Sequence, residues 1–165
     1  MAKPGAGTAD GPRARLLSPL LLADLESAEG QYNFQIILDD MRAARLSGRK
    51  FAFRLRMMAG YDDDQQYGPA YLVNNARCAN GCGFWGDADA ADPGLTWVPD
   101  WNDPYVIARS RALLAALANA IGPTEGLAWI DVGIYGQYGE WAMRSSVYAN
   151  APPAIAPVTL TNKRE

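Results

Sequence analysis

Residues 127–141 read LAWIDVGIYGQYGEW, and this stretch says most about the fold. It begins with an apolar, β-branched run that is typical of a buried strand. Glycines then punctuate a turn that places Glu140 between Gly139 and Trp141. A carboxyl group beside an indole, just past a strand, is an arrangement that sugar chemistry uses, because the acid keeps its proton in partly apolar surroundings and the sugar lies on the flat ring. The simpler alternative is a solvated glutamate beside a packing tryptophan.

A helix is expected immediately before this strand. Asp103 and Pro104 are residue types favoured at an N-cap and a first helical position. Gly122-Pro123 then ends the segment. Between these signals the apolar residues recur at helical spacing: Ile107, Leu114, Leu117 and Ile121.

A second helix and strand are expected further upstream. Asn33 can cap a helix that carries an apolar face and ends near Gly48. Residues 51–57, FAFRLRM, then alternate between apolar side chains and a face that carries Arg54. This pattern fits a barrel strand, whose apolar side chains meet outer helices while the others approach the barrel mouth. The alternative is an edge strand with its arginines in water.

The order of these elements predicts an α/β fold, namely the N-terminal half of a (β/α)8 TIM barrel with one long βα loop. The long loop covers residues 58–101, is rich in aromatic residues and includes an acidic run at 62–64 that fits a solvated turn better than a calcium loop. We expect a disordered leader over residues 1–18, the partial barrel over 19–148 and an irregular tail over 149–165. Barrel chemistry lies at the carboxyl ends of the strands, where Glu140 falls.

Composition removes several functional classes. The chain has 165 residues, 49% of them hydrophobic, which is enough for one domain with a core. It has no histidine, so histidine-based triads and histidine-ligated metals are excluded, and we predict neither a metal nor a cofactor. A net charge of −3 without a basic run argues against a nucleic-acid partner. No apolar stretch reaches membrane-spanning length, and the apolar run LLSPLLLA is a poor signal-peptide core.

Two cysteines, Cys78 and Cys82, lie four residues apart in a glycine-containing segment. This spacing permits a small disulfide loop, whereas two ligands alone make a poor zinc site. A disulfide in an exported protein and two free thiols both fit the pattern, so the sequence leaves the compartment open.

Two stretches resemble a known family. Residues 24–57, DLESAEGQYNFQIILDDMRAARLSGRKFAFRLRM, resemble the segment after the first strand in clan A glycoside hydrolases such as β-galactosidases. That family carries a W-x-x-E-P-x-x-G-x-Y-x-F element there. Leu25-Glu26 and residues 30–34 match it, Ser27 replaces its proline, and no tryptophan precedes. VPDWNDPYV and IDVGIYGQYGEW more closely resemble uncharacterised bacterial barrel proteins that are similar to the same glycosidases, and the resemblance covers roughly residues 22–145.

The resemblance implies roles for particular residues. Glu140 would be the general acid/base that the clan places after its fourth strand, although Gly139 stands where typical members have asparagine. The clan's nucleophile follows the seventh strand, which would lie beyond residue 165. Because a retaining glycosidase needs two carboxyl groups about 5–5.5 Å apart, we expect a barrel fragment. It would be completed by a longer chain, or by a second half-barrel that is its own copy or another chain.

Three functions remain open at this stage. As a glycoside hydrolase, the chain would use Glu140 as acid, Arg54 at the barrel mouth, and three stacking rings: Trp101, Tyr138 and Trp141. As a non-catalytic carbohydrate-binding unit, it would hold sugar with the same rings and with Asp100, Asn102 and Gln137. As a structural remnant, it would keep the barrel pattern without activity, or serve as an assembly partner. The structural alternatives to the sugar roles are that Trp101 packs at the helix entry, Tyr138 forms a turn, and Arg54 pairs with Asp131.

Overall fold

The computed structural model describes residues 15–16, 20–60, 66–87, 94–122 and 126–158. Its centre is a parallel sheet built around β5 (Phe51–Arg56). Strand β8 (Leu127–Gly133) pairs with β5 along its whole length. The short strands β1 (Arg15–Leu16) and β2 (Leu20–Leu21) pair with the start and the end of β5. Because β8 occupies one edge of β5, β1 and β2 share the other edge, and the sheet is three strands wide.

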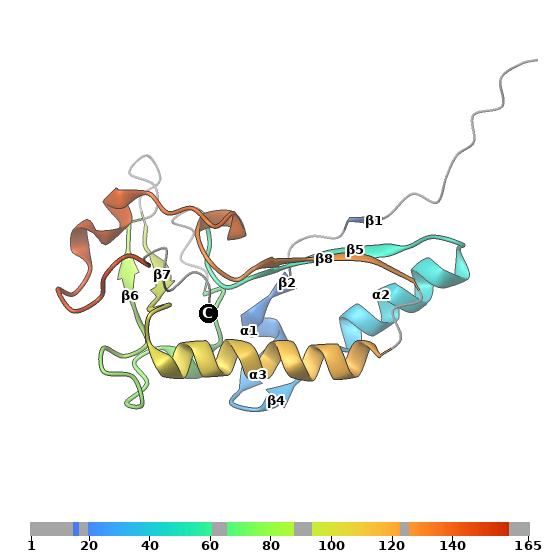
Figure 1. The fold of residues 1–165 in the computed structure, drawn as a ribbon, viewed down its shortest axis with the longest axis horizontal. Helices are drawn as coiled ribbons and strands as arrows, with labels where there is room; N and C mark the ends of the chain where they lie inside the picture. The colour runs from blue at the N-terminus through green and yellow to red at the C-terminus, as the bar shows by residue number, and fades with distance from the viewer. Residues whose placement is uncertain (1–14, 17–19, 61–65, 88–93, 123–125, 159–165) are drawn as a thin grey trace, which may run out of the picture.

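Helices α2 (Gln35–Leu46) and α3 (Pro104–Ile121) lie on the same side of this sheet (Figure 1). Both predicted helices are therefore confirmed. The carboxylate of Asp103 caps α3 by accepting a hydrogen bond of 2.8 Å from the backbone N–H of Tyr105, and the C-cap Gly122 has a positive φ of 60°. The two predicted strands are confirmed as β5 and β8.

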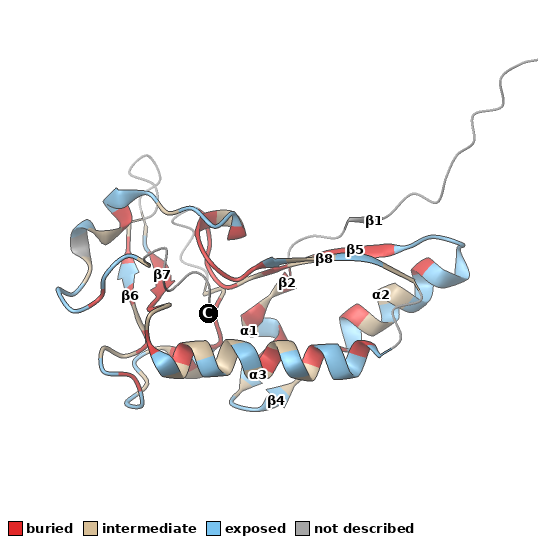
Figure 2. Cartoon of the chain, in the orientation of Figure 1, coloured by how far each residue is buried: buried red, intermediate tan, exposed pale blue. Residues whose placement is uncertain are grey.

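The main core lies between the sheet and the helices. Phe51, Phe53 and Leu55 point to this side from β5 and are almost fully buried. In Figure 2 β5 is largely buried, whereas β8 carries exposed positions. The strands pair in register, so Arg54 of β5 stands beside Asp131 of β8 on the face opposite the helices. The predicted alternation of the strand over residues 51–57 is thus confirmed.

The segment 58–101, predicted to be a loop, contains regular structure. Strands β6 (Gly83–Gly86) and β7 (Thr96–Pro99) form an antiparallel pair, and a short helix, η1 (Ala70–Leu72), precedes them. The prediction missed the pair because both strands are only four residues long. Trp97 of β7 is buried, and its ring lies so close to Gly68 and Gly83 that a side chain at either position would collide with it. The acidic run at 62–64 lies outside the described residues.

The remaining elements are short. Helix α1 (Leu22–Leu25) follows β2, and strands β3 (Glu26–Ala28) and β4 (Gln31–Tyr32) form an antiparallel hairpin. Two short 3-10 helices follow β8, namely η2 (Gln137–Gly139) and η3 (Ser145–Asn150). A second core lies under β6 and β7 and includes Val147 and Ile155. The part of the predicted tail that is described has no strand, but it packs through Ile155.

Two expectations change with the structure. The leader predicted over residues 1–18 lies outside the described residues, except that Arg15–Leu16 form β1. The described residues form an open parallel sheet and no closed barrel. Glu140 lies in the turn that follows β8, the last strand of this sheet in the chain order of the described residues. The predicted order of helix, strand, helix and strand is confirmed by α2, β5, α3 and β8.

Candidate functional site

The turn after β8 is held by its own backbone. Trp141 N–H donates to the carbonyl oxygen of Tyr135 at 3.2 Å, and Gln137 N–H donates to that of Ala142 at 3.0 Å. Gly139 has a φ of +71° and lies against Gly133, so that an added Cβ would come within 2.6 Å of the Gly133 carbonyl oxygen. The glycines that the sequence places in this turn are thus required by a close backbone contact and by positive φ.

An apolar groove of about 190 Å³ lies between this turn and α3. Both predicted tryptophans, Trp101 and Trp141, line it, and each indole is fixed by donating a hydrogen bond to a backbone carbonyl. Trp101 Nε1 donates to Ile134 at 3.1 Å, and Trp141 Nε1 donates to Val132 at 3.2 Å. The other lining residues come from α3, β8 and the turn: Val106, Ile107, Ser110, Arg111, Leu114, Val132, Ile134 and Tyr135.

The two indoles are connected through Tyr135. The ring of Tyr135 meets Trp101 edge-on with centroids 4.9 Å apart, and it meets Trp141 edge-on at 5.9 Å. Burial raises the pKa of the Tyr135 phenol. Trp141 nevertheless keeps 51% of its surface exposed. The groove therefore presents a half-exposed aromatic face in a fixed position.

Glu140 does not line this groove. It is exposed, and its carboxylate makes no hydrogen bond or ion pair with the described residues. Only its backbone N–H is engaged, by donating to the carbonyl oxygen of Gln137 at 3.0 Å. The structure thus brings Glu140 beside Trp141 in the turn, but it does not place the carboxylate within the groove.

Arg54 and Tyr138 lie elsewhere, on the sheet face opposite the helices. Arg54 donates from Nε to Asp131 Oδ2 at 2.6 Å, which confirms the ion pair that the sequence offered as an alternative. Its Nη1 also donates to the carbonyl oxygen of Tyr138 at 3.3 Å. Arg54 therefore ties the turn to the sheet, and neither residue lines the groove.

Gln137 and Asn102 also hold backbone. The buried side chain of Gln137 accepts a hydrogen bond of 3.0 Å from Arg144 N–H. Asn102 Nδ2 donates to the carbonyl oxygen of Ala156 at 2.7 Å and so fastens the C-terminal segment to the start of α3. Both side chains lie outside the groove lining. Of the seven predicted site residues, the groove brings together only Trp101 and Trp141.

A second group of residues was missed by the sequence-based prediction. Arg56, the last residue of β5, stacks against the rings of Tyr67 and Tyr138 at 5.1 and 5.6 Å from their centroids. The sequence did indicate Arg56, because Arg56 follows Arg54 by two residues in the strand and therefore lies on the same face. Tyr67 carried no such signal, since it lies beyond β5 in an irregular segment.

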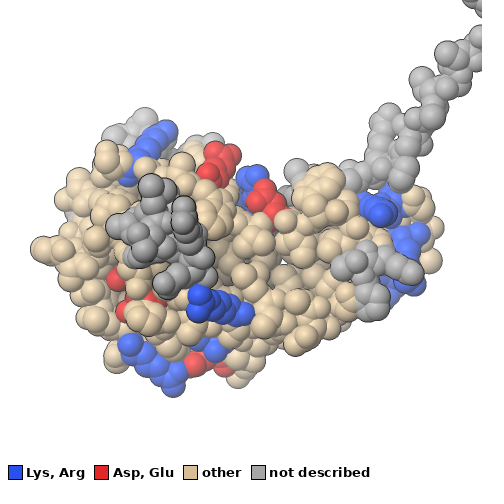
Figure 3. Space-filling view, viewed as in Figure 1, with Lys and Arg blue, Asp and Glu red and all other residues tan. Residues whose placement is uncertain are grey.

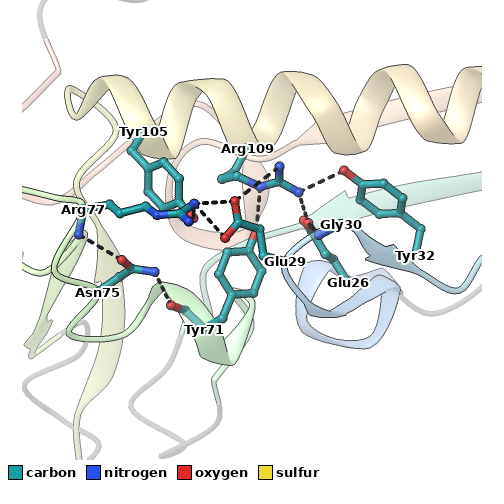
Figure 4. Close-up of polar contacts among 9 residues, drawn as sticks. All are labelled: Glu26, Glu29, Gly30, Tyr32, Tyr71, Asn75, Arg77, Tyr105 and Arg109. Carbon is teal, nitrogen blue, oxygen red and sulfur yellow. Dashed lines mark hydrogen bonds and ion pairs between the residues drawn. The ribbon is translucent and has the colours of Figure 1, made fainter.

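A polar cluster lies on α3 away from the groove (Figure 4). Arg109 makes an ion pair with the fully buried Glu26 and donates hydrogen bonds to the hydroxyl groups of Tyr32 and Tyr71. Glu26 also accepts a hydrogen bond of 2.8 Å from Gly30 N–H. Burial raises the pKa of Tyr71. Three residues that carry the family resemblance, Glu26, Gly30 and Tyr32, thus fasten the β3–β4 hairpin to α3.

Cys78 and Cys82 form a disulfide, so these two thiols are paired and not free. The carbonyl oxygen of Cys82 accepts a hydrogen bond of 2.8 Å from Asp100 N–H, so the disulfide loop is joined to the segment that enters α3. Burial raises the pKa of the Asp100 carboxyl group. Asp100 Oδ1 accepts a hydrogen bond from Asn102 N–H and shapes the turn beside Trp101.

The described residues also bear on metal ions and membranes as binding partners. Within the part of the chain that is described, no group of histidine, cysteine, aspartate or glutamate side chains is arranged to hold a metal ion. None of the described helices combines the length and the apolar character needed to cross a membrane. On the face shown in Figure 3, charged side chains of both signs form small separate groups.

Comparison with protein-family models, with curated proteins and with solved structures finds no match to this chain.

Proposed function

We propose that this chain is a carbohydrate-binding unit and that the groove between Trp101 and Trp141 holds the sugar. The observation that carries the proposal is the fixed pair of indoles, each anchored by an Nε1 hydrogen bond to a backbone carbonyl. A sugar ring stacks on an aromatic face through its C–H bonds, and a fixed ring loses little conformational entropy when the sugar binds.

The groove also brings polar groups to its apolar walls. Ser110 and Arg111 of α3 line it together with the two indoles. Specific small-molecule sites combine apolar walls with a few polar groups that bind hydroxyl groups of the ligand. Glu140 adjoins Trp141 in the exposed part of the turn and is the candidate acceptor for a further hydroxyl group.

We further propose that the strands of this open sheet are the first strands of a (β/α)8 barrel of the glycoside hydrolase type. Three features support it: the strands are parallel, they stand in chain order, and the helices cover one face. Arg54, Arg56 and Asp131 lie on the opposite face, which becomes the interior when such a sheet closes.

Binding is proposed here rather than hydrolysis by the chain alone. Glu140 remains the candidate general acid/base of a completed barrel, but a retaining reaction needs a second carboxyl group about 5–5.5 Å away. Asp131, which stands on the sheet face near the turn, is engaged in the ion pair with Arg54.

The proposal is tested by titrating the chain with gluco-, galacto-, manno- and xylo-oligosaccharides and following tryptophan fluorescence. We expect saturable quenching by at least one series. Trp141→Ala should abolish it, and Trp101→Ala should weaken it. Trp129→Ala is the matched control, since Trp129 is also about half exposed but lies outside the groove. No response to any series, or equal loss in the control, contradicts the proposal.

A second candidate function is assembly with a half-barrel, either another copy or another chain. It is favoured by β8, whose only partner strand among the described residues is β5. Trp129, Val132 and Trp141 are 52%, 37% and 51% exposed along this strand and the turn after it. An open strand edge with exposed apolar side chains invites pairing with another chain.

Assembly with its own copy predicts a defined dimer by light scattering at micromolar concentration. Val132→Lys should convert that dimer to a monomer, because the charge would be buried in the interface. A monomer of unchanged mass over the whole concentration range would rule out self-association.

A further inference from the structure

Arg56 occupies a distinctive place at the carboxyl end of the central strand. It is the last residue of β5, between the fully buried Leu55 and Met57. Tyr67 and Tyr138 reach its guanidinium group from two different segments, one after β5 and one after β8. The ring of Tyr138 lies flat on Gly60, where an added Cβ would come within 2.1 Å of the ring carbon Cε1. A glycine thus makes room for the ring that covers Arg56.

The charge of Arg56 is not matched by a carboxylate in the described residues. Within the described residues its guanidinium group stacks on the two tyrosine rings, and its buried Nε has no hydrogen-bond acceptor. The neighbouring Arg54 behaves differently, because it is paired with Asp131. A partly buried guanidinium without an anion is unusual, since buried donors are almost always satisfied.

We propose that Arg56, framed by Tyr67 and Tyr138, binds the carboxylate or phosphate group of a small ligand at the carboxyl ends of β5 and β8. An arginine side chain offers a planar fork of N–H donors that matches an oxyanion with two hydrogen bonds. Ligands of open parallel sheets bind outside the carboxyl ends of the strands, which is where Arg56 lies. The site is separate from the tryptophan groove and does not depend on the sugar proposal.

The experiment uses the intact chain and follows the Nε–Hε signals of its arginines by NMR. The Arg56 signal is assigned from its absence in Arg56→Lys. Sodium phosphate and sodium acetate are the probes, each compared with sodium chloride at equal ionic strength. We expect at least one probe, and not chloride, to shift the Arg56 signal to saturation. A response to phosphate alone identifies a phosphate site, and a response to acetate identifies a carboxylate site.

Variants separate this site from general attraction of anions. Arg56→Gln should weaken binding at least about tenfold, measured for all variants by isothermal titration calorimetry because this one lacks the Arg56 signal. Arg42→Gln, which removes an exposed arginine from α2, should leave binding unchanged. Gly60→Ala should also weaken binding, because it displaces the Tyr138 ring while Arg56 remains.

The proposal is overturned if neither probe shifts the Arg56 signal beyond the chloride control, or if Arg42→Gln reduces binding as much as Arg56→Gln does. The titration of the unmodified chain decides the first outcome even if Arg56→Gln does not fold. The fluorescence response to sugars reports on Trp141 instead, so failure here and failure of the sugar proposal are distinguishable.

Discussion

The two sides of helix α3 differ in how completely they are covered. On one side, Arg109 is surrounded by Glu26, Tyr32 and Tyr71 in a network of hydrogen bonds with a buried ion pair. On the other side, Ile107 and Leu114 face a groove whose tryptophan wall stays half exposed. The covered side is built to hold the hairpin in place, whereas the open side leaves apolar surface for a ligand or a partner.

The largest effect is expected from breaking the covered side. Glu26→Gln removes the buried anion and leaves Arg109 with only the more distant and partly exposed Glu29, at 4.0 Å, which should lower the free energy of unfolding by about 3 kcal/mol. Urea denaturation followed by circular dichroism measures it. The double variant Glu26→Leu/Arg109→Met should recover much of the loss, because it removes both charges together. A loss below about 1 kcal/mol in Glu26→Gln would mean that the pair does not hold this side.

A smaller effect is expected from the turn that carries the open side. Gly139→Ala forces a side chain against the Gly133 backbone at positive φ, and it should cost about 2 kcal/mol. Trp141 emission should shift to the red as the turn lifts from β8. Gly122→Ala is the control, since Gly122 has a similar φ of +60° but no neighbour within 4 Å of an added Cβ. Equal losses at both positions would mean that φ strain, and not the contact with Gly133, explains the glycine.

Trp141→Ala should cost still less stability, about 1 kcal/mol, because the indole is half exposed and gives up one hydrogen bond to Val132. Thermal and urea unfolding measure this change. Trp141→Ala should also lose sugar binding while remaining folded. A loss as large as that of Glu26→Gln would instead make Trp141 part of the core.

The smallest change in stability is expected at the exposed margin of the polar cluster. Arg77 donates two hydrogen bonds to Glu29, and both side chains are exposed, Arg77 more than Glu29. Arg77→Met should therefore shift the urea midpoint far less than Glu26→Gln does. Desolvation raises the pKa of the Glu29 carboxyl group, but hydrogen bonds with Tyr105 and Arg77 act in the opposite direction, and the pKa lies below its usual value. The stabilisation is therefore present above the pKa of the unfolded glutamate and disappears as the pH falls through the lower folded pKa.

Several elements were readable from local sequence. Asp103-Pro104 and Gly122 marked both ends of α3, and alternation marked β5, because these signals act within one turn of helix or one strand. Hairpins of short strands were missed, since two to four residues carry too little periodicity to be recognised. The disulfide required structure for the same reason, as spacing alone permitted two states of Cys78 and Cys82.

The candidate site shows the limit of sequence-based prediction more clearly. Residue types and their positions beside strands and helices identified the turn after β8 and the two tryptophans, Trp101 and Trp141. They also grouped Arg54 and Tyr138 with those tryptophans, whereas the structure places these two on the opposite sheet face. The order of strand and helix, the caps and the aromatic turn follow from local sequence, because each depends on neighbours along the chain. The set of side chains that share a groove, and the stacking of Arg56 on two tyrosines, follow from the fold, because these contacts join segments distant in sequence.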